Sequence, residues 1–233
     1  MPETQDLLLL PGLLCDDRLW RDQIAALRGL ARCSVPDLTR DDSLAAMAAR
    51  ALSAAPPRFA LCGLSMGGYL TFEILRRAPE RVTRLALFDT SARPDTPEQA
   101  RRRHGLMALA RSGRFRGVTP RLLPQLVHPA HVEGPIGREV MAMAERVGQE
   151  AFLRQQAAIL GRADSRPDLP GLRLPALIAV GEADMLTPPP LAEEMASLIP
   201  GARLAVIPGC GHLPPIEDPA ATTTLLRAWL QAA

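Results

Sequence analysis

Apolar and polar positions along the chain follow two alternating patterns. Short, nearly continuous apolar runs of strand length lie at residues 6–10, 31–35, 58–63, 84–89, 174–181 and 202–208. Longer stretches with helical periodicity occupy residues 19–30, 43–55, 66–78, 188–199 and 219–231. Strands that are apolar nearly throughout are covered on both faces, which is typical of parallel strands joined by crossover helices. The pattern therefore predicts the α/β class.

The segment between the fourth and fifth apolar runs breaks this alternation. It contains no convincing strand and is rich in Arg, Met and Pro. Because it begins and ends at strand tips, it can fold back over the edge of the sheet. We expect a core domain formed by residues 1–92 and 168–233, interrupted by a helical cap insertion at residues 93–167. An ordinary pair of peripheral helices would fit the same pattern.

Composition and charge narrow the class of protein. The chain has 233 residues, of which 47% are hydrophobic and 22% charged, and this length allows one large globular domain or two small ones. All 27 basic residues are Arg and are set against 25 acidic residues, so the net charge is only +2. Such a balance argues against a nucleic-acid partner. The absence of Lys excludes Schiff-base chemistry and Walker-type phosphate binding.

Cysteine spacing and the N-terminal apolar run bear on metal binding and location. The four cysteines form no CxxC pair and no spacing that suits zinc, so we expect reduced, partly buried thiols and no metal. The apolar run at residues 7–14 lacks a basic flank, is interrupted by Pro11 and Gly12, and is too short to cross a membrane. We therefore expect neither a signal peptide nor a membrane anchor, and a cytoplasmic location.

The most informative motif is GLSMGG at residues 63–68, between a predicted strand and a predicted helix. A serine on such a turn adopts a strained backbone conformation that lifts its hydroxyl out of the fold at a helix N-terminus. The free N–H groups and the dipole of the helix favour a developing oxyanion there. This placement makes Ser65 a candidate nucleophile.

A serine nucleophile needs a histidine base that a carboxylate orients. His212 follows the last predicted strand in a glycine-rich loop, whereas the other three histidines fall in the insertion. Asp184 and Asp89 both end predicted strands at the sheet edge where such sites gather. Asp184 gives the chain order Ser, Asp, His and is preferred. Asp89 would instead cap the following turn through its side chain.

With these motifs the sequence resembles the α/β-hydrolase fold enzymes over essentially its whole length. The resemblance rests on residues 7–14 (LLLLPGLL), 63–68 (GLSMGG), 79–82 (PERV), 181–184 (GEAD) with 187–189 (TPP), and 208–212 (PGCGH) with 217–219 (EDP). These motifs are specific for the fold and only weakly specific for a substrate.

The resemblance also implies an oxyanion hole. Its donors would be the backbone N–H groups of Leu13 and Met66. In such enzymes a histidine usually stands where this chain has Pro11, so the support that the side chain gives the loop is absent here. Only five residues precede the first strand, which leaves no room for the antiparallel hairpin of many members. A sheet of about six strands, all parallel, is therefore expected.

From these residues we expect a serine hydrolase that cleaves carboxylic esters without a cofactor. Its substrate would be a small-molecule ester or lactone. A lactonase of the enol-lactone type, an acyltransferase or a carbon–carbon hydrolase would use the same fold, and a non-catalytic small-molecule binding protein is an alternative of another class. The run Arg101-Arg102-Arg103 is either a solvated helix face or a means of attracting an anionic substrate.

Overall fold

A single six-stranded sheet organises the protein. The computed structural model describes residues 4–232, and within them the strand order is β2-β1-β3-β4-β5-β6. The strands are β1 (Gln5–Leu10), β2 (Ala31–Ser34), β3 (Phe59–Leu64), β4 (Val82–Phe88), β5 (Ala176–Gly181) and β6 (Arg203–Ile207). Every neighbouring pair is parallel, which confirms the expected sheet.

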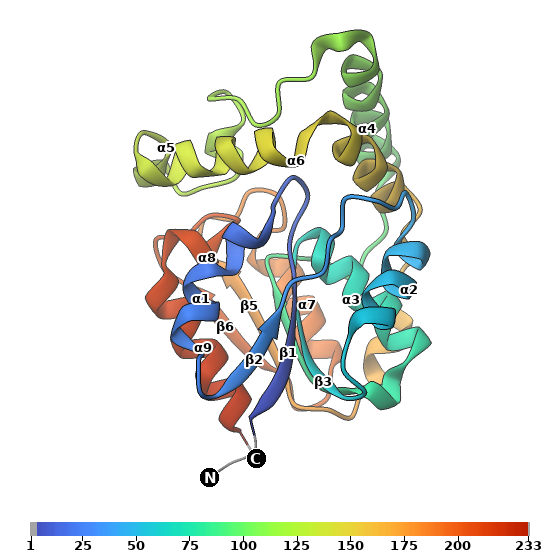
Figure 1. The fold of residues 1–233 in the computed structure, drawn as a ribbon, viewed down its shortest axis with the longest axis vertical. Coiled ribbons are helices and arrows are strands. Elements are labelled where there is room, and N and C mark those ends of the chain that lie inside the picture. Colours follow the sequence, from blue (N-terminus) through green and yellow to red (C-terminus); the bar gives the residue numbers. More distant parts are fainter. Residues whose placement is uncertain (1–3, 233) are drawn as a thin grey trace.

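Helices cover both faces of this sheet (Figure 1). One face carries α2 (Leu44–Ala54), α3 (Met66–Arg77) and α7 (Pro189–Leu198), and the other α1 (Arg21–Ala26), α8 (Pro214–Glu217) and α9 (Pro219–Gln231). Burial on both faces explains why β3 and β5 are buried at every position. The expected helix at residues 19–30 is shorter than predicted, because a 3₁₀ turn at Asp17–Trp20 precedes α1.

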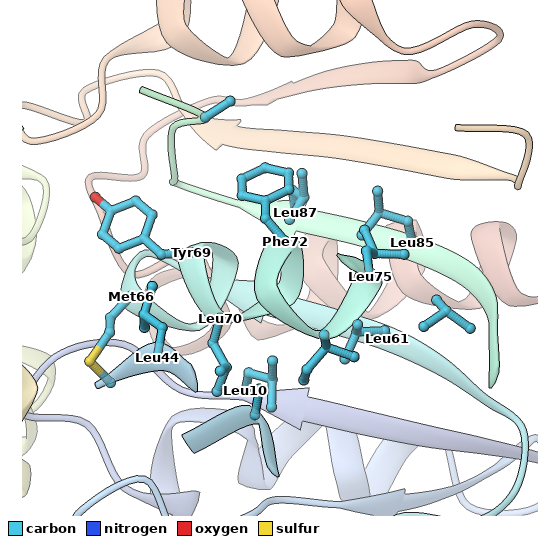
Figure 2. Packing of buried hydrophobic residues seen from close by; sticks show 14 of the residues in the cluster. Leu10, Leu44, Leu61, Met66, Tyr69, Leu70, Phe72, Leu75, Leu85 and Leu87 are labelled. Atoms are coloured by element: carbon cyan, nitrogen blue, oxygen red, sulfur yellow. The ribbon is translucent and has the colours of Figure 1, made fainter. Parts of the chain in front are cut away.

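Helix α3 lies at the centre of the larger apolar cluster and follows β3 directly (Figure 2). Leu70 and Ile74 are fully buried on this helix, and they belong to the same cluster as Leu10 of β1 and Leu61 of β3. Burial of each such side chain contributes about 1.5–3 kcal/mol. The packing fixes α3 on the sheet, and with it the turn between β3 and α3.

All regular structure between β4 and β5 in the described residues is helical, as the sequence predicts. The main elements are α4 (Pro97–Leu109), α5 (Pro129–Val132) and α6 (Pro135–Leu160). Gly148 has a φ of 79°, and at this residue α6 bends. Figure 1 shows these helices as a layer above the carboxyl ends of the strands. The division into a core (residues 1–92 and 168–233) and a cap (residues 93–167) stays a prediction.

Helix ends follow the local sequence signals. Ser43 caps α2 by accepting a hydrogen bond from the Ala46 N–H, as its position before an Ala-rich run predicts. Thr96 and Gln99 form a reciprocal capping box at the start of α4. Within residues 4–232, no helix is long and apolar enough to cross a membrane.

Candidate active site

Ser65 stands on the sharp turn between β3 and α3. Its φ of 54° and ψ of −114° place it outside the conformations that serine ordinarily adopts. Its N–H donates to the Phe88 carbonyl at 3.0 Å, and its carbonyl accepts from the Thr90 hydroxyl at 2.8 Å. Neighbouring β4 and the residues after it therefore hold the strained turn from both sides.

Two glycines allow this turn to pack closely. A Cβ on Gly63 would overlap the backbone of Gly67, and a Cβ on Gly67 would overlap the Leu10 carbonyl of β1. Both positions therefore require the absence of a side chain rather than an unusual φ. Glycine at these positions lets the start of α3 lie against the sheet, which leaves Ser65 at the N-terminus of a helix.

Asp184 and His212 form a buried pair. Asp184 follows β5 and His212 follows β6, and their Oδ2 and Nδ1 atoms lie 2.8 Å apart. The Asp184 side chain is fully buried and that of His212 is 4% exposed. Burial raises the pKa of Asp184, but the charge and hydrogen bond of His212, together with the other hydrogen-bond donors around the carboxylate, lower it to about 2. The carboxylate is therefore ionised and orients the imidazole.

The hydroxyl and N–H of Thr187 complete the surroundings of this carboxylate. Asp184 Oδ2 accepts from Thr187 Oγ1 at 2.7 Å, and Oδ1 accepts from the Thr187 and Leu186 N–H groups at 3.2 and 2.8 Å. A buried anion needs such donors to offset its lost hydration. The first residue of the TPP motif, Thr187, thus stabilises the Asp184 carboxylate, a function that the resemblance of the motifs alone did not indicate.

Asp89 also lies beside this pair but is bound differently. Its Oδ1 accepts from the Gly181 N–H at 2.8 Å, so the expectation that it caps the following turn is not met. Its Oδ2 is buried with no hydrogen-bond partner that the structure records. Burial and the nearby charge of Asp184 raise the pKa of Asp89 well above its ordinary value. Burial and the adjacent anion thus favour the protonated form of Asp89, beside an ionised Asp184.

The loop that carries His212 is held by Glu217, a residue whose function the sequence analysis missed. The Glu217 carboxylate is fully buried and accepts from the N–H groups of Gly211 and Leu213, both at 3.0 Å. It also accepts from the His128 N–H at 2.6 Å and lies 3.0 Å from His131 Nδ1. The signal available in the sequence was a glutamate shortly after the histidine loop, in the EDP motif at residues 217–219.

The loop of residues 11–15 lies against Ser65. A Cβ on Gly12 would come within 3.4 Å of the Ser65 Cβ. Within residues 4–232, the N–H groups of Leu13 and Met66 donate to no protein acceptor that the structure records. The resemblance implies that these two groups would donate to an oxyanion at Ser65, and this assignment stays a prediction.

The three predicted catalytic residues thus share the carboxyl edge of the sheet. Asp184 and His212 are hydrogen-bonded, and Ser65 directly follows the carboxyl end of β3 in the same parallel sheet. Among the described residues, no hydrogen bond is recorded between the Ser65 hydroxyl and the His212 ring. Such contacts often form only in the substrate complex.

Side chains able to bind a metal come together at one place in residues 4–232. They are Asp89, Asp184 and His212, whose potential ligand atoms lie within 4.8 Å of one another. Two of the three already bind each other in the pair described above, so this arrangement is that of an acid–base pair. The expectation of no metal and no cofactor stays a prediction.

The Arg101-Arg102-Arg103 run divides between two environments. Arg101 and Arg102 are exposed on α4. Arg103 is half-buried, and its guanidinium contacts Asp95 at 2.7 Å and Gln156 at 2.9 Å. Arg162 contacts the same buried Asp95 at 2.7 Å. Arg103 is thus part of an internal polar network, and its hydrogen bond to Gln156 joins α4 to α6.

The fold and the strained serine turn define an α/β hydrolase. Residues 7–224 match the alpha/beta hydrolase family, and the chain belongs to that family. Among solved structures, a malate-bound thermophilic esterase from Thermogutta terrifontis superimposes with a TM-score of 0.86 at 30% identity, covering 97% of this chain and 89% of that one. The enol-lactonase from Burkholderia xenovorans LB400 gives 0.85 at 26% identity, covering 99% and 92%.

Curated relatives include esterases. The pimeloyl-[acyl-carrier protein] methyl ester esterase of Nitrosomonas europaea is 29% identical over 232 residues, which cover 92% of this chain and 91% of that protein. The protein with the same name from Neisseria meningitidis serogroup C is 29% identical over 177 residues, which cover 73% and 69%.

The close packing at Gly67 generates a prediction about the serine turn. Gly67→Ala should lower the free energy of unfolding by about 1–3 kcal/mol, because the new methyl group overlaps the Leu10 backbone. Thermal unfolding measures this. Gly105→Ala is the matched control, because Gly105 is exposed on α4 with open space around its Cα and should be neutral or slightly stabilised. Equal melting temperatures for the two variants would contradict the packing argument.

Proposed function

We propose that the protein hydrolyses carboxylic esters through Ser65, His212 and Asp184. The observation that carries the proposal is the buried Asp184–His212 pair at the same sheet edge as a serine with positive φ. Such a pair supplies the base that an unactivated serine requires. The similarity to the Thermogutta terrifontis esterase and to the methyl ester esterases supports ester cleavage.

In the first half of the reaction, His212 Nε2 removes the Ser65 proton while Ser65 Oγ attacks the ester carbonyl carbon. The carbonyl oxygen becomes an oxyanion, to which Leu13 and Met66 donate their backbone N–H groups. Asp184 accepts a hydrogen bond from the Nδ1–H of the imidazole, which leaves Nε2 unprotonated and able to act as the base. His212 then protonates the leaving alcohol, and the acyl group remains on Ser65.

In the second half, water replaces the alcohol. His212 takes a proton from the water, whose oxygen attacks the acyl carbon and forms a second oxyanion in the same hole. Collapse of this intermediate breaks the bond to Ser65 Oγ and releases the carboxylic acid. The proton on His212 returns to Ser65, so the enzyme regains its starting state.

Ser65→Ala tests the nucleophile. Turnover of a p-nitrophenyl ester should fall by at least about 10³-fold, because no acyl-enzyme can form. A fluorophosphonate probe should label the native protein and leave Ser65→Ala unlabelled, as measured by intact mass. An unlabelled native protein would instead favour the non-catalytic binding protein.

The two buried aspartates give a second test. Asp184→Asn should lower kcat by about 10⁴-fold, because an amide favours the wrong imidazole tautomer. Asp89→Asn should retain kcat within about 3-fold, because the proposed mechanism does not use Asp89 and the amide oxygen can still accept from the Gly181 N–H. With the pKa of Asp184 at about 2, its carboxylate stays ionised above pH 4. Titration of Asp184 should therefore add no inflection to the profile of kcat/KM against pH above pH 4, in the native protein or in Asp89→Asn. Loss of activity in Asp89→Asn alone would reverse the assignment.

An arginine surface favours a second candidate, an esterase for acyl chains on an acidic carrier protein. Residues 99–132 contain no Asp or Glu. Six exposed arginines lie in this stretch: Arg101, Arg102, Arg111, Arg114, Arg116 and Arg121. Within residues 4–232 no ion pair is recorded for any of them, whereas most other arginines contact a carboxylate. The relatives that act on acyl-carrier-protein methyl esters agree with such a substrate.

Charge reversal separates the two candidates. Arg111→Glu with Arg114→Glu should lower kcat/KM for a methyl ester on acyl carrier protein by about 10-fold or more at low salt, since like charges then meet. The free methyl ester of the same acid should change far less. Arg28→Glu with Arg203→Glu, which changes the net charge equally at two exposed sites elsewhere, is the control. If both substrates respond alike, the carrier-protein candidate fails and the general esterase remains.

A further inference from the structure

The loop of residues 11–15 needs support from outside itself. Leu14 has a φ of 59°, a left-handed conformation that costs a leucine free energy. The loop closes a tight turn in which the Cys15 N–H donates to the Gly12 carbonyl at 3.2 Å. Pro11 offers no side-chain donor to fix the turn. The surroundings must therefore hold Leu14 in place.

Gln155, in the second half of α6, provides that support. Its Oε1 accepts from the Leu14 N–H at 3.0 Å, and its Nε2 donates to the Leu38 carbonyl at 3.2 Å. The side chain is fully buried, so bulk solvent does not compete with these two partners. One amide thus joins the loop at residues 11–15, the segment that follows β2, and α6.

Apolar packing joins the same elements. Leu14 is buried in a small cluster with Ala110, Ala144 and Phe152, and the last two belong to α6. Arg154, next to Gln155, donates to the Thr39 carbonyl at 2.7 Å. The loop beside Ser65 therefore rests on α6, which lies in the predicted cap, as well as on the sheet below it.

We propose that Gln155 is the positioning residue for the oxyanion hole. By holding the Leu14 N–H, it fixes the peptide next to the Leu13 N–H, which is one residue away in a turn of only four residues. The proposal rests on the proposed function, in which Leu13 donates to the oxyanion. It means that α6 sets the geometry of a catalytic group that lies about 140 residues earlier in the chain.

The test compares Gln155→Leu with native protein and with Gln156→Leu. Gln156 is an equally buried glutamine whose Oε1 accepts from Arg103, so it matches the chemistry without contacting the loop. In Gln155→Leu we expect kcat to fall about 10-fold or more, with KM within about 3-fold of the native value. A misplaced oxyanion donor weakens binding of the transition state, where the negative charge develops, and leaves binding of the substrate nearly unchanged. Gln156→Leu should keep its kcat.

A transition-state analogue distinguishes positioning from a loss of folding. A trifluoromethyl ketone adds to Ser65 and places its oxyanion in the hole, so its inhibition constant should rise by the same factor as kcat/KM falls. If Gln155→Leu does not fold, Gln155→Asn serves instead, since its shorter side chain withdraws the amide without adding an apolar group. A folded variant at residue 155 that keeps the native kcat would overturn the proposal. An equal loss of kcat in Gln156→Leu would overturn it as well. An inactive, unlabelled native protein would overturn the proposed function instead.

Discussion

The backbone of Ser65 holds a conformation that costs about 1–3 kcal/mol when nothing compensates. The compensation is distributed over three strands, since β3 leads into the turn, β4 accepts the Ser65 N–H, and β1 lies against Gly67. Each of these contacts requires the strands to be adjacent and in register. The parallel sheet is thus the structure that keeps one serine in a strained turn.

The two aspartates near His212 are both buried, and they differ in the hydrogen-bond donors that surround them. Asp184 has four hydrogen-bond donors around its two oxygens and lies beside the imidazole, so it stays ionised at 0% side-chain exposure. Asp89 has one backbone donor and a negative neighbour, so its pKa is raised. The number of donors decides which carboxyl holds the charge. Either residue ends a strand at the correct edge, and only the contacts distinguish them.

The same distinction explains how far the sequence can predict this protein. Runs such as residues 174–181 are apolar because both faces of the sheet are covered. The strands, their alternation with helices along the chain, and the helical insertion therefore follow from local pattern. The serine turn follows from glycines at Gly63 and Gly67. Two contacts do not follow from local pattern. The hydrogen bond from the Gly181 N–H to Asp89 spans 92 positions of the chain, and the one from the Leu14 N–H to Gln155 spans 141.

Contacts from residues 93–167 reach both loops that flank the serine. Gln155 binds the loop of residues 11–15 on one side. On the other, the Leu126 carbonyl accepts from the His212 N–H at 3.0 Å, and the His128 N–H donates to the carboxylate of Glu217 that also holds the Gly211 N–H. A helical layer above the edge of a sheet needs no polar contact with the sheet loops if its function is simply to exclude water. Here its polar groups bind the backbone beside the proposed base and beside the expected oxyanion donor. The positions of these helices and of the proposed catalytic groups therefore depend on each other.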